Sequence, residues 1–190
     1  ADPSGPYPNT GDQSVCLNAT EPYGVEPTSG STYTWYVDDA LTSPGGDWTI
    51  TGNGNSSITV TWSKAGVYTL KVVEENSNGC VGDPVSIQVT VNALPDAPSA
   101  GDVTVCYDGS VHTGSATAGV GESIVWYDSA TNGSVTTAPS GTSAGTYTAY
   151  AAAKNTTTNC ESATRTLVTV QINALPDAPS AGDVTVCYDG

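Results

Sequence analysis

The chain has 190 residues, with 4 Lys and Arg against 19 Asp and Glu and a formal net charge of −15. Binding to nucleic acid or to an anionic membrane surface requires clustered Lys and Arg, so this charge balance excludes both partners. No apolar run approaches the ~18 residues of a membrane span, so we expect no direct membrane insertion. With no initiator Met and no leader, we expect a processed or excerpted piece of a longer protein.

The apolar residues alternate with polar ones through most of the chain, which predicts half-buried strands. In chain order, one-sided apolar faces occur in 33–38, 57–63, 67–73 and 85–91, and again in the last strand of the second half, at Val168, Val170 and Ile172. Turn signals such as "SPGGD", "GNGN" and "TNGS" separate these runs. The pattern indicates an all-β chain.

The stretch "NALPDAPSAGDVTVCYDG" occurs at 92–109 and, identical at every position, at 173–190. We therefore predict domain 1 at 1–93, domain 2 at 94–175, and the linker and first strand of a third unit at 176–190. That third unit either continues into further copies, the alternative we favour, or donates its strand 183–188 to a neighbouring subunit. Equivalent positions place four aromatic residues in the cores: Trp35, Trp126, Tyr68 and Tyr147.

The five cysteines follow the same repeat. Cys16, Cys106 and Cys187 occupy equivalent places in successive units, and Cys80 and Cys160 are the second members of the first two. We predict the pairs Cys16–Cys80 and Cys106–Cys160, with Cys187 unpaired. Such disulfides indicate an oxidising, extracytoplasmic compartment.

About seven short strands per unit, with the order Cys, Trp, Tyr, Cys, predict tandem immunoglobulin-like antiparallel β-sandwich domains, each with one disulfide. The pattern "VC…W…GxYT…GC…VTV" resembles the immunoglobulin-like and PKD-like repeats of secreted surface proteins of Bacteroidetes-type bacteria, including gliding-motility adhesins. The resemblance implies a location outside the cell, on a bacterial surface, and often export by the type 9 system. The sorting domain usual for that route does not occur in these 190 residues.

Between the predicted domains, Pro95 and Pro98 restrict the backbone of the linker, which predicts a short, semi-rigid junction. A rigid junction repeated along an array is the functional interpretation; an ordinary connection preserved by recent duplication is the alternative.

No catalytic set is evident, and we predict that the chain is not an enzyme. The single histidine, His112, lies near Asp108 without a nucleophile motif. We expect no cofactor, with calcium held by Asp96 and Asp102 as the alternative. Candidate glycosylation sites are the sequons at Asn18, Asn55, Asn132 and Asn155, and Ser129 in a "DSA" motif.

These observations favour a structural repeat segment, a spacer or stalk of a long extracellular bacterial protein or filament. Its partners would be further copies of the repeat and neighbouring filament subunits. Two alternatives remain: an adhesin module that binds a glycan or a protein, with Trp48, Tyr36 and Tyr127 as stacking candidates, or an accessory domain of a secreted enzyme.

Overall fold

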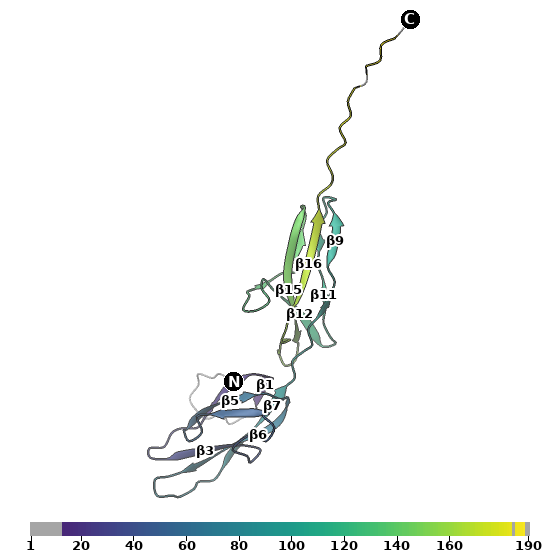
Figure 1. Cartoon of the computed structure of the whole chain (residues 1–190). Helices are drawn as coiled ribbons and strands as arrows, with labels where there is room; N and C mark the ends of the chain where they lie inside the picture. The colour runs from purple at the N-terminus through teal and green to yellow at the C-terminus, as the bar shows by residue number, and fades with distance from the viewer. Residues whose placement is uncertain (1–12, 184, 189–190) are drawn as a thin grey trace.

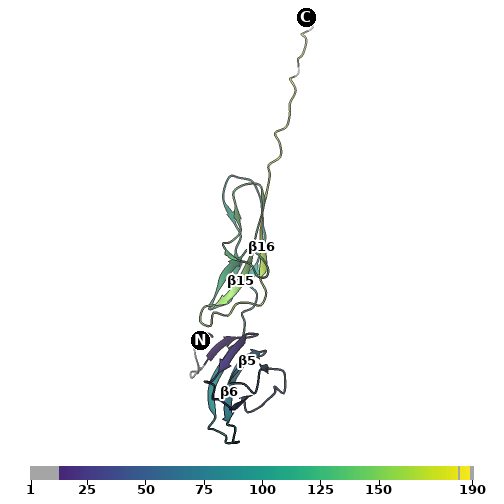
Figure 2. The same cartoon turned by 90° about the vertical axis from the view of Figure 1, so that its left-hand side faces the viewer.

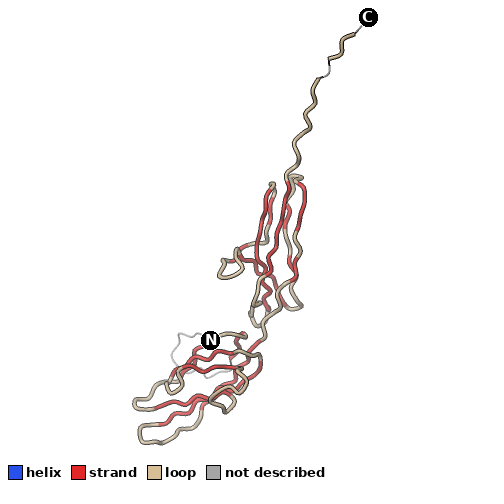
Figure 3. The backbone as a smooth tube through the Cα atoms, in the orientation of Figure 1, coloured by secondary structure: helices blue, strands red, loops and turns tan. Residues whose placement is uncertain are grey.

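The structure is a computed structural model that describes residues 13–183 and 185–188. These residues contain sixteen strands and no helix. Figures 1 and 3 show that the strands gather into two bodies placed end to end, here called the N-terminal body (residues 13–92) and the C-terminal body (residues 99–173). Residues 93–98 form the linker between them. In the described part of the chain there is no helix with the length and apolarity needed to cross a membrane.

The N-terminal body is a sandwich of two sheets. One sheet has the order β1-β7-β6-β3 and the other β2-β5-β4. Its strands are β1 (Gln13–Cys16), β2 (Thr20–Gly24), β3 (Thr32–Val37), β4 (Trp48–Thr51), β5 (Ser57–Trp62), β6 (Gly66–Glu75) and β7 (Val85–Asn92).

The core of the N-terminal body lies between these two sheets. Alternate residues of β3, β5 and β6 are buried, as the apolar alternation of the sequence predicted. Trp62 is fully buried at the centre, and its indole N–H donates a hydrogen bond of 3.1 Å to the hydroxyl of Tyr23. The Trp62 ring also meets the rings of Tyr23 and Tyr68, with centroid distances of 6.3 and 5.2 Å. The polar edge of the indole is therefore satisfied inside an otherwise apolar core.

The C-terminal body has one five-stranded sheet, of order β13-β12-β15-β16-β9, and two short strand pairs, β10-β14 and β11-β8. Figure 2 shows this body from the side. Its strands are β8 (Ser99–Ala100), β9 (Val103–Cys106), β10 (His112–Thr113), β11 (Ala116–Thr117), β12 (Glu122–Tyr127), β13 (Val135–Thr136), β14 (Ser140–Gly141), β15 (Gly145–Asn155) and β16 (Thr166–Asn173).

Small residues fill the core of the C-terminal body, and its aromatic residues are less buried than the sequence predicted. Ala149, Ala151 and Ala153 of β15 are buried, as are Val168, Val170 and Ile172 of β16, and Ala149 pairs directly with Val168. Trp35 and Tyr68 are buried in the N-terminal body, at 3% and 7% exposure, but Trp126 and Tyr147 are only half-buried. Trp126 and Tyr147 pair with the buried residues Ala151 and Val170 and share their sheet face, as predicted, but they are less completely buried than Trp35 and Tyr68. Tyr127, the neighbour of Trp126, is the aromatic residue of β12 that is buried, at 8%.

Both bodies share one connectivity, in which the first strand pairs with the last. β1 pairs in parallel with β7, and β9 pairs in parallel with β16. The bodies are thus immunoglobulin-like β-sandwiches with one parallel strand pair each, rather than wholly antiparallel ones. The predicted strand 183–188 is not formed at its described residues, which carry no regular structure. In both bodies the first strand pairs with the last strand of its own unit, whereas the described residues 174–183 and 185–188 have no strand paired with them.

Candidate functional site

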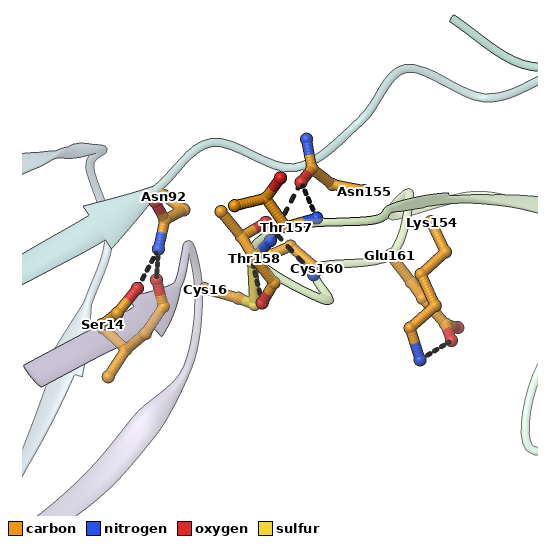
Figure 4. Close-up of a disulfide and its surroundings, with 10 residues drawn as sticks. Ser14, Cys16, Asn92, Lys154, Asn155, Thr157, Thr158, Cys160 and Glu161 are labelled. Atoms are coloured by element: carbon orange, nitrogen blue, oxygen red, sulfur yellow. Dashed lines mark hydrogen bonds and ion pairs between the residues drawn. A yellow bond between two sulfur atoms is a disulfide. The ribbon is translucent and has the colours of Figure 1, made fainter. Parts of the chain in front are cut away.

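The feature that joins the two bodies is a disulfide between Cys16 and Cys160, with a Cα–Cα distance of 5.6 Å. This distance is usual for a disulfide. Figure 4 shows it where the end of β1 meets a loop of the C-terminal body. The linker already connects the bodies through the backbone, so the disulfide is a second covalent connection between them.

Strand pairing fixes the position of Cys16. It is the last residue of β1 and lies opposite Asn92, the last residue of β7. The Asn92 side-chain amide donates hydrogen bonds to the Ser14 hydroxyl at 2.8 Å and to the Val15 carbonyl at 2.9 Å, and the Leu17 amide donates to the Asn92 carbonyl at 2.8 Å. Because Asn92 directly precedes the linker, Cys16 is held at the end of the body that faces its neighbour.

Cys160 lies in a tight loop that follows β15. The side chain of Asn155 accepts hydrogen bonds from the amides of Thr157 and Thr158, and the Asn155 amide donates to the Cys160 carbonyl at 2.9 Å. Asn159, just before the cysteine, has the left-handed φ of 61° that asparagine tolerates. Cys160 is 1% exposed. The loop thus presents a fixed, buried sulfur to the N-terminal body.

The structure corrects the predicted pairs Cys16–Cys80 and Cys106–Cys160. Cys16 bonds to Cys160, while Cys80 and Cys106 are free and exposed, as is Cys187. The first and last strands end beside the start of β6, where Gly66 pairs with Val91, whereas Cys80 lies beyond the other end of β6. The 10 residues of β6 span about 30 Å, several times the Cα–Cα distance that a disulfide allows.

The same separation applies to the C-terminal body. Cys106 lies opposite Asn173, beside the start of β15, and Cys160 follows the far end of that 11-residue strand. The cysteines of one unit therefore lie at its opposite ends. The sequence contained a sign of this separation. A long alternating stretch lies between the two cysteines of each unit, and a stretch of that length forms one strand that separates its two ends.

The linker is tied to the C-terminal body. The Thr166 hydroxyl donates a 2.6 Å hydrogen bond to the Pro98 carbonyl, and β8 pairs with β11 immediately afterwards. Pro98 is buried and Pro95 is half-buried. The Thr169 amide donates to the Asp102 carboxylate at 2.9 Å. The short free part of the linker is thus confined to the residues around Pro95.

Asp96 and Asp102, the calcium ligands proposed from the sequence, belong to no group of three or more metal-binding side chains among the described residues. Asp96 and Asp102 are both exposed, and the Asp102 carboxylate already accepts the Thr169 amide. Among the described residues, no group of three or more His, Cys, Asp and Glu side chains is arranged to hold a metal ion. Calcium binding by this pair stays a prediction.

His112 and Asp108 form an exposed contact at the beginning of β10. The imidazole Nε2 lies 3.0 Å from Asp108 Oδ1, which also accepts the Ser110 amide at 2.8 Å. The Ser110 amide and then His112 lower the pKa of Asp108. The same oxygen therefore organises the turn at Ser110, which is a structural role for this pair.

The glycosylation candidates differ in accessibility. Asn18, Asn55 and Asn132 are exposed, and Asn18 and Asn132 lie in turns with left-handed φ values of 67° and 53°. Asn155 is half-buried and its side chain organises the Cys160 loop. Ser129 is half-buried, and its carbonyl accepts a hydrogen bond from Arg165. Modification at these sites remains a prediction.

The aromatic residues considered for stacking on a sugar are covered by other side chains. Trp48 is 5% exposed. The Arg165 guanidinium lies 3.3 Å from the centroid of the Tyr127 ring, and the Tyr127 hydroxyl donates to Glu161 at 2.7 Å. The ammonium of Lys71 lies 4.9 Å above the Tyr36 ring while it also binds Asp39. A cation therefore lies over one face of the Tyr36 ring and one face of the Tyr127 ring.

The fold defines a protein built of immunoglobulin-like β-sandwich bodies. More particularly, residues 95–174 match the family "Ig-like domain CHU_C associated". No curated protein matches the chain in sequence.

Solved structures with a similar fold include fibronectin(III)-like modules of CbhA from Clostridium thermocellum, at 15% identity and a TM-score of 0.41, covering 92% of this chain and 97% of that one. An I-band fragment of titin is 17% identical with a TM-score of 0.38, over 86% of this chain and 62% of that one. The glucan-locus protein SGBP-B of Bacteroides ovatus, solved with a mixed-linkage heptasaccharide, is 18% identical with a TM-score of 0.36, over 90% and 46% of the two chains. These likenesses concern the fold.

Proposed function

We propose that the chain is a stiff spacer segment of a long extracellular protein or filament on a bacterial surface. The observation that carries this proposal is the Cys16–Cys160 disulfide between the two bodies. A domain joined to its neighbour by one peptide segment swivels about that segment by default. A second covalent connection on the same end face removes most of that freedom and fixes the angle between the bodies.

The anchored linker adds to this stiffness. The hydrogen bond from Thr166 to the Pro98 carbonyl and the pairing of β8 with β11 fasten the end of the linker to the C-terminal body. Pro95 and Pro98 restrict the few remaining backbone angles. The junction thus resists bending through a strand contact, two prolines and a disulfide, a combination suited to transmitting force or maintaining distance.

A structural disulfide favours a location outside the cytoplasm, because the cytoplasm keeps thiols reduced. The strongly acidic composition, with a net charge of −15, keeps such an extended protein soluble and self-repelling. The match of residues 95–174 to an immunoglobulin-like family supports an exported surface protein of the kind found in Bacteroidetes-type bacteria. Its partners are then further units of the same kind and neighbouring subunits of a filament.

The test is the distribution of angles between the two bodies in electron micrographs of single particles, with and without reductant. We expect a narrow distribution that broadens when the disulfide is reduced, and a smaller broadening for the double variant Pro95→Gly, Pro98→Gly with the disulfide intact. A distribution equally broad in oxidised and reduced protein would refute the stiff-spacer proposal. The variant Cys80→Ser, which removes an exposed free thiol, is the control.

A further inference from the structure

We propose that Cys16–Cys160 is one step of a head-to-tail disulfide series. In it, the cysteine at the end of a unit's first strand bonds to the late-loop cysteine of the unit that follows. Cys106 is then the reactive site for the counterpart of Cys160 in a unit that continues from residues 173–190. This inference rests on the proposed spacer function and names the partner of that same junction.

Cys106 is placed as Cys16 is. Cys16 ends β1 opposite Asn92, and Cys106 ends β9 opposite Asn173, both in parallel pairs. The next amide in each case donates a 2.8 Å hydrogen bond to the carbonyl of that asparagine, from Leu17 and from Tyr107. The two sulfurs therefore leave the same end of the same strand pair, and one of them is already bonded to the following body.

The complementary position is also repeated. Cys80 and Cys160 each follow a residue in the left-handed conformation, Gly79 at 77° and Asn159 at 61°. The residue after each cysteine closes an isolated bridge to the central strand, Val81 to Glu75 and Glu161 to Lys154.

In each loop an asparagine amide donates to the cysteine carbonyl, from Asn76 at 3.0 Å and from Asn155 at 2.9 Å. Cys80 is exposed at the end of its body remote from the linker, whereas Cys160 is buried against the preceding body. The two loops are thus the same kind of site, with a free cysteine at Cys80 and a disulfide-bonded cysteine at Cys160.

The connecting segment brings these sites together. Residues 92–109 span the asparagine beside Cys16, the linker and the first strand of the next body, and residues 173–190 repeat that segment without a difference. The Pro98 carbonyl is held by Thr166, a residue of the body that follows the linker. A further unit carrying the same contacts is held at the same distance and angle, so its late loop faces Cys106.

The bond forms by oxidation of two thiols. The Cys106 thiol and the loop thiol lose two protons and two electrons as the sulfur–sulfur bond forms. The electrons pass to the disulfide of an exchange partner, such as oxidised glutathione or an oxidised thiol–disulfide oxidoreductase, which is released as two thiols. An exposed thiol at the strand end is accessible to such a partner.

The test is a lengthened chain. Residues 110–190 are appended after Gly190, which completes a third unit without any new junction sequence. The appended copy carries Thr157→Ser, an exposed position, so that its loop peptide differs in mass from that of Cys160. The protein is folded in a glutathione redox buffer, free thiols are blocked, and disulfide-linked peptides are identified by mass spectrometry. The 190-residue chain is mapped in parallel, and the lengthened chain with Cys106→Ser is the matched control.

We expect two disulfides in the lengthened chain, Cys16–Cys160 and Cys106 to the appended loop cysteine, with complete loss of thiol labelling at Cys106. In the 190-residue chain Cys106 stays labelled and Cys16–Cys160 is present. In the Cys106→Ser control the appended loop cysteine is labelled instead. The proposal is overturned if Cys106 stays reactive in the lengthened chain, or bonds to Cys80, Cys160 or Cys187. A Cys106–Cys160 bond in the 190-residue chain also overturns it, and that outcome does not depend on how the appended unit folds. A swivelling junction in micrographs with both bonds present would refute stiffness and leave the series intact.

Discussion

Breaking the disulfide with Cys160→Ser should lower the stability of both bodies, although neither loses a contact within its own core. The bond closes a sequence separation of 144 residues. In the chain-entropy treatment, a loop of that length restricts the unfolded chain by about 5 kcal/mol, which is an upper value. Typical measured effects are about 2–4 kcal/mol, and we expect about 3 kcal/mol here.

The assay is guanidinium unfolding followed by tryptophan fluorescence. Trp35, Trp48 and Trp62 are buried in the N-terminal body, so the signal reports mainly on that body. With a denaturant slope of about 3 kcal/mol/M, a loss of about 3 kcal/mol moves the midpoint down by about 1 M. Reductant added to the unaltered protein should produce the same shift and have no effect on Cys160→Ser.

Two comparisons separate this effect from other consequences of the substitution. Cys16→Ser removes the same bond from the other side and should match Cys160→Ser, apart from the cost of a serine hydroxyl at the buried Cys160 position. Cys80→Ser changes a free, exposed cysteine and should leave the midpoint unchanged. If the unaltered protein, Cys16→Ser and Cys160→Ser share one midpoint, the reasoning from loop closure fails.

Three further predictions concern the cores and the junction. Burial raises the pKa of Tyr23 from its ordinary 10.0 to about 12. The stability that depends on the neutral phenol is therefore fully present below pH 10 and is lost as the pH rises toward 12. The Tyr23→Phe variant should lack this loss of stability in alkaline unfolding, and an unfolding curve against pH identical to that of the unaltered protein would contradict the prediction. Gly141→Ala places a Cβ 2.0 Å from the Tyr147 ring and should destabilise the C-terminal body by about 1–3 kcal/mol in thermal unfolding, whereas Gly101→Ala, with nothing within 4 Å, should not. If Asp96 and Asp102 hold calcium, EDTA should lower the melting temperature and Asp102→Asn should abolish that response; an unchanged melting temperature removes calcium from the junction.

Much of the fold was predictable because strands leave a local signal. The alternation at Tyr33, Trp35 and Val37, and at Ile58, Val60 and Trp62, put these side chains on one face, and the structure buries all six. The thin alanine face of β15 was also visible in the sequence. The partial exposure of Trp126 was not visible, because it depends on what covers the sheet. Trp126 lies on the same face as its buried partner Ala151, whereas Tyr127 is buried on the opposite face, beneath the Arg165 guanidinium.

The sequence alone determined the all-β class, the equivalent positions of its cysteines and the repeated junction, because alternation, turn residues and identity between segments can be read locally. The tertiary structure decided which cysteines meet. A disulfide requires two Cα atoms within a few ångströms, and that distance depends on the length of β6 and β15 and on which ends of the bodies face each other. Spacing alone therefore predicts the wrong partner for Cys16, which meets Cys160 only when two separately folded bodies are placed end to end.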